Sequence, residues 1–152
     1  TGLTLIASGS FPAAATLDIT SIPQTYGAII LYWAGVSCDT ATRSFLIQHT
    51  TNATVNRGVG ILNTAVQNFN TQANMFDSQN QTAAETTSGV MIIHGYQAGP
   101  QKIYQIQAGN SGGGTHAVLG AAQQAAAIET LNLLWNGSGS FDAGTYALYG
   151  VN

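Results

Sequence analysis

Short segments in which hydrophobic and polar residues alternate are the feature that most constrains the fold of this chain. Residues 15–20 place Leu17 and Ile19 on one face of a strand and polar residues on the other. A period of two is typical of a β-strand with one buried face. Residues 101–107 alternate as well, and there we expect the Ile and Tyr positions to oppose Lys102 and the glutamines.

Other segments are predicted to be strands because β-branched, aromatic and apolar residues run together between turn residues. Residues 27–36 are nearly all apolar, so we expect a central strand that is buried on both faces. Residues 128–135 place the side chains of Leu131, Leu133 and Trp135 on one face. The remaining expected strands are 3–7, 44–49, 89–96 and 145–151.

Two segments are less clearly patterned. Residues 61–75 are compatible with a short helix or with two irregular strands. Residues 117–127 are rich in Ala and could be helical by propensity, but Gly120 and the flanking strands favour a loose strand followed by a loop. Residues 50–60 are expected to form a polar loop, and residues 79–87 a loop or an edge strand.

Turn signals divide these strands at regular intervals. The glycine-rich segment 109–114 is the strongest of them, Asn136 and Gly137 form another, and residues 142–144 are expected to turn the last hairpin. About eight to ten short strands separated by turns are typical of a sandwich or a barrel. With no linker to divide the chain, we predict a single all-β domain over residues 1–152, a jelly-roll-like antiparallel β-sandwich.

Charged residues make up only 6% of the 152 residues, and the net charge is −3. The basic residues Arg43, Arg57 and Lys102 are too few for the basic surface that nucleic acid requires, so no nucleic-acid partner is expected. No apolar run approaches the ~20 residues of a membrane helix, so no membrane insertion is expected. A surface with so little charge suits a domain that packs against neighbouring molecules, and it equally suits a secreted domain with a neutral, solvated surface.

The residues that could support chemistry are scattered. His49, His94 and His116 lie on separate predicted elements without ligands at metal-binding spacing, so we expect neither a metal site nor a cofactor. Cys38 has no base beside it in the sequence and is expected to be a buried, unreactive thiol. No pair of acids is marked for catalysis, so no catalytic residue is predicted and the chain is not expected to be an enzyme.

Uncharged aromatic and amide side chains are the remaining candidates for binding, because flat rings and amides suit sugars. Core packing is the favoured alternative for Tyr32, Trp33 and Trp135; Tyr104 is a further aromatic candidate. The ligand-binding candidates are Tyr96, Asn56, Arg57 and Asn110.

Two stretches resemble a known family. The first is residues 15–26, which end in an Ile-Pro-x-x-Tyr pattern at Ile22, Pro23 and Tyr26. An apolar strand follows from Ala28. The second is residues 140–151, which contain the sequence GTYALYG. Both are similar to the ends of the β-sandwich domains of bacteriophage virion proteins, the head and tail fibre, spike and decoration proteins. The two stretches cover about a quarter of the chain and look structural rather than catalytic.

The resemblance implies an exposed virion structural domain on the surface of the extracellular particle. It implies assembly with itself, commonly as a homotrimer, contact with other virion proteins, and contact with a host-surface polysaccharide. A secreted non-catalytic carbohydrate-binding module is the alternative, and it predicts an exposed row of aromatic side chains. A glycan-degrading enzyme would instead need two acids facing each other, such as Asp77 and Glu85.

Overall fold

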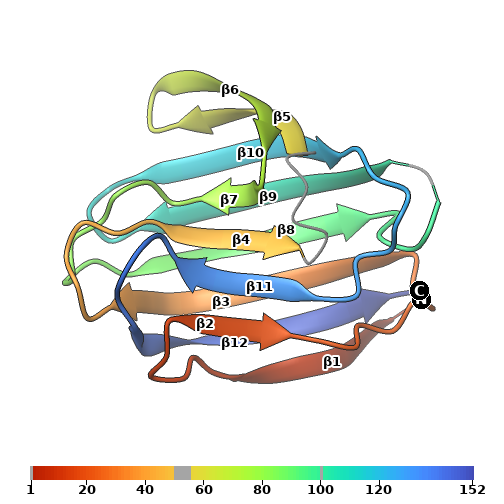
Figure 1. The fold of residues 1–152 in the computed structure, drawn as a ribbon, viewed down its shortest axis with the longest axis horizontal. Helices are drawn as coiled ribbons and strands as arrows, with labels where there is room; N and C mark the ends of the chain where they lie inside the picture. The colour runs from red at the N-terminus through yellow and green to blue at the C-terminus, as the bar shows by residue number, and fades with distance from the viewer. Residues whose placement is uncertain (1, 50–55, 100) are drawn as a thin grey trace.

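The computed structural model describes residues 2–49, 56–99 and 101–152, and shows two β-sheets packed face to face (Figure 1). Every strand pair is antiparallel. The jelly-roll-like antiparallel β-sandwich predicted from the sequence is therefore confirmed. No helix occurs among the described residues, so none there could cross a membrane.

The larger sheet has eight strands and forms one layer of the sandwich. In spatial order it consists of β1 (Leu3–Ser10), β12 (Phe141–Val151), β3 (Ala28–Cys38), β8 (Thr87–His94), β9 (Lys102–Asn110), β10 (Thr115–Ala122), β5 (Asn56–Leu62) and β6 (Ala65–Gln72).

The smaller sheet has four strands and covers one face of the larger sheet. In spatial order it consists of β2 (Thr16–Ile19), β11 (Leu131–Trp135), β4 (Phe45–His49) and β7 (Asn74–Asp77). The β5–β6 hairpin lies beyond β7, at the end of the larger sheet (Figure 1). The larger sheet therefore has one face in the core and one face with no second layer over it.

The core between the sheets is centred on an aromatic cluster. The ring of Phe45 lies 5.7–6.2 Å from five neighbouring rings, mostly in tilted or edge-on arrangements. Those neighbours are Phe11, Trp33, Phe76, Trp135 and Phe141. Offset and edge-on ring pairs stabilise a core beyond the area they bury, so Phe45 links the two sheets at their centre.

The opening and closing segments of the chain pack against each other. The ring of Tyr26 covers Gly150, where a Cβ atom would lie 2.3 Å from the ring. The backbone N–H of Gly27 donates to the carbonyl of Val151 at 2.9 Å. The hydroxyl of Tyr96 donates to the carbonyl of Pro23. The residues of both terminal motifs are thus used to join β12 to the segment that leads into β3.

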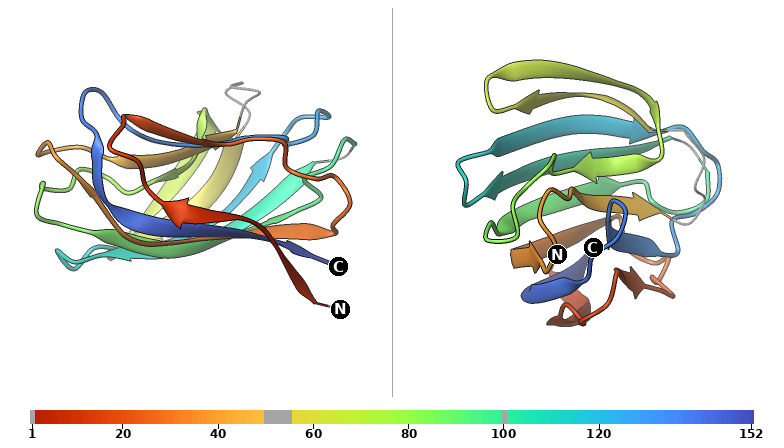
Figure 2. Two further views of the ribbon diagram at one scale, coloured as in Figure 1. Left: turned by 90° about the horizontal axis from the view of Figure 1, so that it is seen from below. Right: turned by 60° about the vertical axis from the view of Figure 1, so that its left-hand side comes forward.

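The two ends of the chain leave the domain at one corner. Strands β1 and β12 are antiparallel neighbours, and Leu3 pairs with Val151. Figure 2 shows the ends side by side in both views.

Three predictions about the central strands are corrected by the structure. Strand β3 is not buried on both faces, because the smaller sheet covers only one of them and the side chain of Tyr32 is 43% exposed. Residues 142–144 do not turn a hairpin: β12 passes through them with two bulges, and Gly144 adopts a φ of 120°. In β9 only the first two positions differ from the expected pattern, since Lys102 is buried and Ile103 is 48% exposed. Tyr104 and Ile106 are buried and the two glutamines are exposed, as expected.

The burial of Lys102, and with it the exposure of Ile103, follows from the hydrogen bonds that the Lys102 side chain makes. Its side chain lies on the core side with Tyr104 and Ile106, and its Nζ donates to the carbonyl of Gln124 at 2.9 Å. Burial lowers the pKa of this lysine. Backbone carbonyls at the edge of the core therefore allow a charged side chain to occupy a position that the sequence pattern gives to an apolar one.

The less patterned segments form strands and loops. Residues 61–75 contain the end of β5, the β6 strand and the start of β7, so the helical alternative is wrong. Strand β10 ends at Ala122 and a loop follows, as expected. Residues 50–55 of the expected polar loop lie outside the described residues, whereas residues 56–60 belong to β5. Residues 78–86 are a loop that makes one bridge, between Arg43 and Gln81.

Candidate functional site

The uncovered face of the larger sheet, here called the outer face, is organised by strand pairing into three rows. Each row takes one side chain from successive strands, because paired residues point to the same side of a sheet. The middle row is Leu5, Tyr149, Ile30, Ile92, Gln105, Leu119, Val59 and Asn68. The rows on either side are Ser8, Ala147, Tyr32, Val90, Gln107, Ala117, Ile61 and Val66, and Leu3, Val151, Ala28, His94, Ile103, Ala121 and Arg57.

The outer face is unusually apolar for a surface in contact with water. Among the described residues, the large hydrophobic side chains that are exposed all belong to its three rows. They are Leu3, Leu5, Tyr32, Val59, Ile61, Val66, Ile103 and Leu119, with exposed fractions from 43% to 67%. In the rows given above, Arg57 is the only residue with a formal charge, and it lies at the end of its row. An apolar face of this kind marks a site of interaction.

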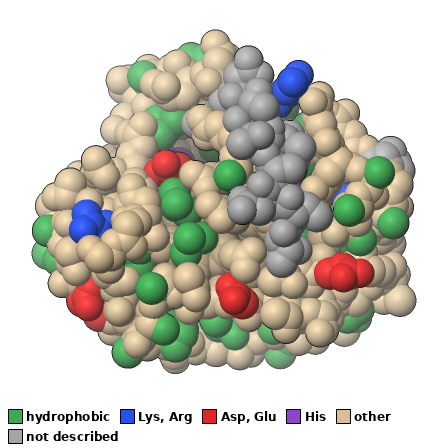
Figure 3. All heavy atoms as spheres, viewed as in Figure 1, with side chains coloured by type: hydrophobic (Ala, Val, Ile, Leu, Met, Phe, Trp, Pro, Cys, Tyr) green, Lys and Arg blue, Asp and Glu red, His purple; other side chains and the backbone are tan. Residues whose placement is uncertain are grey.

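The opposite surface of the molecule, over the smaller sheet, is polar. A row of polar side chains crosses its outer side, where Asn132 Nδ2 donates to Asp18 Oδ1 at 2.8 Å and Gln48 Nε2 donates to Asn74 Oδ1 at 2.6 Å. Figure 3 shows this side of the molecule, with acidic and hydrophobic side chains in separate small groups among atoms of the backbone and of other side chains. The two sides of the sandwich therefore differ in chemistry, because the large hydrophobic side chains that are exposed among the described residues lie on the outer face of the larger sheet.

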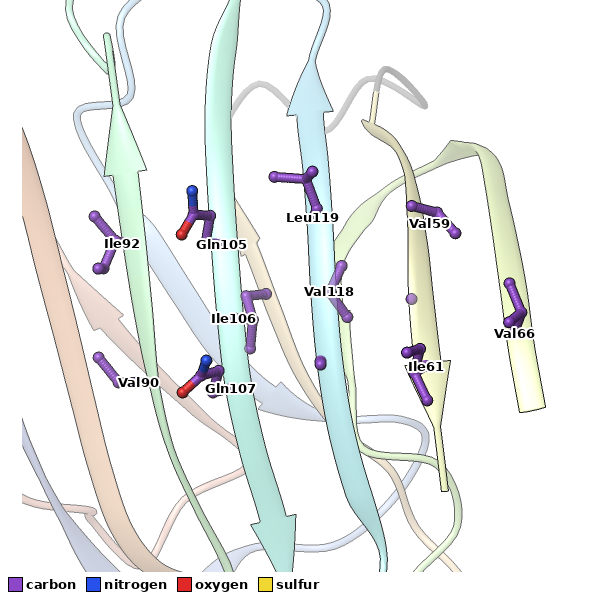
Figure 4. A pocket seen from close by; sticks show the side chains of 12 residues that line it. Val59, Ile61, Val66, Val90, Ile92, Gln105, Ile106, Gln107, Val118 and Leu119 are labelled. Atoms are coloured by element: carbon purple, nitrogen blue, oxygen red, sulfur yellow. The ribbon is translucent and has the colours of Figure 1, made fainter. Parts of the chain in front are cut away.

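A hollow of about 570 Å³ lies on the outer face over strands β8, β9, β10, β5 and β6. Figure 4 shows the amides of Gln105 and Gln107, on β9, between Val90 and Ile92 on β8 and Leu119 on β10. The far side of the hollow is lined by hydrophobic side chains of β5 and β6: Val59, Ile61 and Val66. The hollow thus offers uncharged hydrogen-bonding groups within an apolar lining.

Beside the hollow, two tyrosines form an aromatic pair on the same face. The rings of Tyr32 on β3 and Tyr149 on β12 lie 6.0 Å apart and are edge to face. Tyr32 pairs with Val90 across β3 and β8, and Val90 lines the hollow. The outer face therefore has two adjoining parts, an exposed aromatic pair and a hollow.

The structure does not bring the four predicted ligand-binding residues together. Tyr96 is fully buried, and burial raises the pKa of its hydroxyl, which bonds to backbone atoms of Pro23 and Tyr26. Asn56 is 1% exposed, and its Nδ2 donates to the carbonyl of Ala73 at 2.9 Å. Neither side chain can present its polar group to a ligand in this structure.

The other two predicted residues lie on strands β5 and β9, toward opposite ends of the strands. Arg57 is exposed on the outer face, in β5. Asn110 ends β9, and its Oδ1 accepts a hydrogen bond from the backbone N–H of Gly114 at 2.7 Å. This bond closes the β9–β10 turn, so Asn110 has a structural role there. Of the four residues, Arg57 alone lies on the outer face.

The aromatic residues considered for sugar binding are mostly part of the core. Trp33, Tyr104 and Trp135 are each 2% exposed. Tyr32 is the exception, since it is 43% exposed on the outer face. The exposed aromatic row that a carbohydrate-binding module would present is thus reduced to Tyr32 and the half-buried Tyr149 beside it.

The histidines and the cysteine are separated in the fold. Among the described residues there is no group of three metal-binding side chains. His49 and His116 are buried, and burial lowers the pKa of both. His49 Nε2 lies 3.3 Å from Asn56 Oδ1. Cys38 is a buried free thiol whose pKa is raised by burial, which makes the reactive thiolate scarce.

Sequence reasoning missed the outer face as a site. Gln105, Gln107 and Leu119 were not singled out, because single residues in separate strands give no motif. A signal was nevertheless present. Strands β5, β9 and β10 each carry hydrophobic residues at both odd-numbered and even-numbered positions, which point to opposite faces of the sheet. If only one face is covered, some of these hydrophobic side chains must be exposed.

No protein-family model and no curated protein matches this sequence. Among solved structures, a toad ovary galectin in complex with thio-digalactose is similar over 88% of this chain and 99% of that chain, with 11% identity and a TM-score of 0.36. Galectin-Ib of Xenopus laevis has 10% identity over 87% and 99%, with a TM-score of 0.34. A tetrameric galectin from the ball sponge Cinachyrella sp. has 8% identity over 90% and 99%, with a TM-score of 0.31. Similarity at this level transfers no binding activity to this chain.

Proposed function

We propose that this chain is a structural domain of a virion, a head or tail fibre, spike or decoration module that assembles with copies of itself. In this proposal it lies on the surface of the extracellular particle and forms a homotrimer in contact with other virion proteins. A host-surface polysaccharide is a further partner. No catalytic role is proposed for it.

The observation that carries the proposal is the confinement of the large hydrophobic side chains that are exposed among the described residues to one sheet face, whose three rows carry a single formal charge, at Arg57. A domain that stays alone in water normally avoids such a face, because it promotes association. The low content of charged residues, 6%, supports the same conclusion, since few charges would have to be buried when copies pack together.

The roles of the two terminal motifs also support it. The resemblance to virion domains rests on residues 15–26 and 140–151, and in the fold these segments hold β12 against the entrance to β3. A structural role of this kind for both motifs fits a domain whose function is to assemble.

The test is to look for the chain in particles and to measure its mass. We expect mass spectrometry and immunogold labelling to find it on purified particles made by the genome that encodes it. We also expect light scattering to give a mass above that of the 15.7 kDa monomer. A chain that is absent from particles and strictly monomeric at high concentration would overturn the proposal.

A secreted non-catalytic carbohydrate-binding module is the second candidate. It is favoured by the amides of Gln105 and Gln107, which lie uncharged in an apolar hollow beside Tyr32. This candidate predicts hits on a glycan array that are lost when both glutamines are changed to Ala. An array without hits would exclude it.

A further inference from the structure

We infer that the outer face of the larger sheet is where a second copy of this chain binds, with the aromatic pair of one copy seated against the hollow of the next. This inference rests on the proposed self-assembly and names the surface that performs it. It commits to a second copy as the occupant, on four observations about charge, polar groups, shape and size.

The charge of the outer face suits a partner that is identical to it. Two copies of one surface bring like charges together unless the surface is neutral, and like charges directly opposed destabilise a contact. In the three rows Arg57 is the only formally charged residue, and it lies at the end of its row. A charged partner would find no complementary group in the middle of the face, whereas a second copy meets no repulsion there.

The polar groups at the centre of the face are self-complementary. A glutamine amide has both a donor and an acceptor, so it can pair with the same amide of another copy. Gln105 and Gln107 are exposed and lie between hydrophobic strands (Figure 4). In a contact between copies related by a two-fold axis they would satisfy each other, which avoids the cost of burying unpaired polar groups.

The shape of the face provides both parts of a contact between copies. The aromatic pair of Tyr32 and Tyr149 lies on β3 and β12. The hollow begins at β8, the next strand of the sheet, and extends over β9, β10, β5 and β6. Copies related by a rotation can place the aromatic pair of each against the hollow of another. A two-fold axis does this twice in a dimer, and a three-fold axis does it around a closed ring.

The size of the face matches what a stable interface needs. Eight strands, each about 4.8 Å wide, cover about 38 Å, and three rows, each about 7 Å along the strands, cover about 20 Å, which gives roughly 760 Å². A standard protein interface buries about 800 Å² on each partner. The outer face alone is therefore close to the area required.

The test places one charge in each part of the face and measures association. Leu119→Glu alters the rim of the hollow and Tyr32→Glu removes half of the aromatic pair; both side chains are about half exposed, so the fold should survive. Thr16→Glu is the matched control, because it adds the same charge to an exposed site on the polar side of the sandwich. Circular dichroism and the urea midpoint verify that each variant folds.

Sedimentation equilibrium should show an oligomer for the unaltered chain and for Thr16→Glu. In each outer-face variant we expect the dissociation constant of that oligomer to rise by about 100-fold or more, as for a residue central to an interface. A second readout is hydrogen exchange: backbone amides of β9 and β10 should be protected in the oligomer and less so in the variants at equal concentration.

The outcomes separate this inference from the proposed function. If the chain assembles and neither outer-face variant weakens the assembly, the inference is wrong while the proposed assembly stands. If the unaltered chain is monomeric, both fail. If it is monomeric and a glycan protects β9 and β10 from exchange, the face belongs to a carbohydrate site, and the inference is likewise overturned.

Discussion

The contact between Tyr26 and Gly150 joins the two terminal motifs, and adding a single methyl group measures its strength. A Cβ atom on residue 150 would lie 2.3 Å from Tyr26 Cδ2 and 2.4 Å from Cγ, whereas ordinary contacts begin at 3.4 Å. Over-packing of this kind costs about 1–3 kcal/mol. The ring of Tyr26 is only half-buried and can turn outward, so we expect Gly150→Ala to lower the free energy of unfolding by about 1–2 kcal/mol.

The same substitution without the ring isolates the contact. In a Tyr26→Ala background the added methyl group has room. Gly150→Ala should then be neutral or should stabilise by about 0.5 kcal/mol, because alanine loses less backbone entropy than glycine in a strand. The double-mutant cycle should therefore show a coupling free energy of about 2 kcal/mol between the two positions.

Urea unfolding of the four proteins, followed by tryptophan fluorescence, measures these differences, provided that the slope against urea is constant. Gly120→Ala is a useful comparison, because its Cβ would lie 2.2 Å from the ring of Tyr104, which is 2% exposed and cannot turn away. It should cost about 3 kcal/mol, more than Gly150→Ala. Equal costs of Gly150→Ala with and without Tyr26 would refute the reasoning.

Three further predictions concern the core. Phe45→Ala should lower the unfolding free energy by about 4 kcal/mol in urea, because it empties the centre of the aromatic cluster; a cost below about 1 kcal/mol would contradict that placement. Burial lowers the pKa of His49 and His116 in the folded state. The unfolded chain therefore binds more protons as pH falls below the ordinary value of 6.5, and stability, complete above that pH, should decrease in acid. His116→Leu should reduce this slope, and an unchanged slope in that variant would argue against the reasoning. The thiol of Cys38 should react with a disulfide reagent only as fast as the chain unfolds, and immediate labelling in native buffer would show that it is accessible.

The sequence predicted strands well where hydrophobic residues repeat every second position. Residues 16–19 and 131–135 became β2 and β11, with Ile19 and Leu131 in the core as expected. The pattern has a physical basis, because a strand that buries one face must alternate. The fold class could be deduced from these segments and from the glycine-rich turn at 109–114.

The candidate site could not be deduced, because it depends on which strands become neighbours. Ile103 and Tyr104 are adjacent and apolar, so the pattern alone does not say which of them faces the core. The answer depends on the buried Lys102, whose ammonium group reaches the carbonyl of Gln124, 22 residues along the chain. In the same way, the exposure of Tyr32 depends on the smaller sheet covering only one side of β3.

The pairing of β1 with β12 has a consequence for how the domain can be attached to other molecules. Leu3 and Val151 are opposed in an antiparallel ladder, where paired Cα atoms lie about 5 Å apart. The whole sandwich can therefore be grafted into a surface loop of a carrier protein without forcing the two ends of that loop apart. A fluorescent protein fused to the N-terminal end would lie at the same corner of the domain as one fused to the C-terminal end. Either fusion would therefore show which way this corner of the domain faces in a larger assembly.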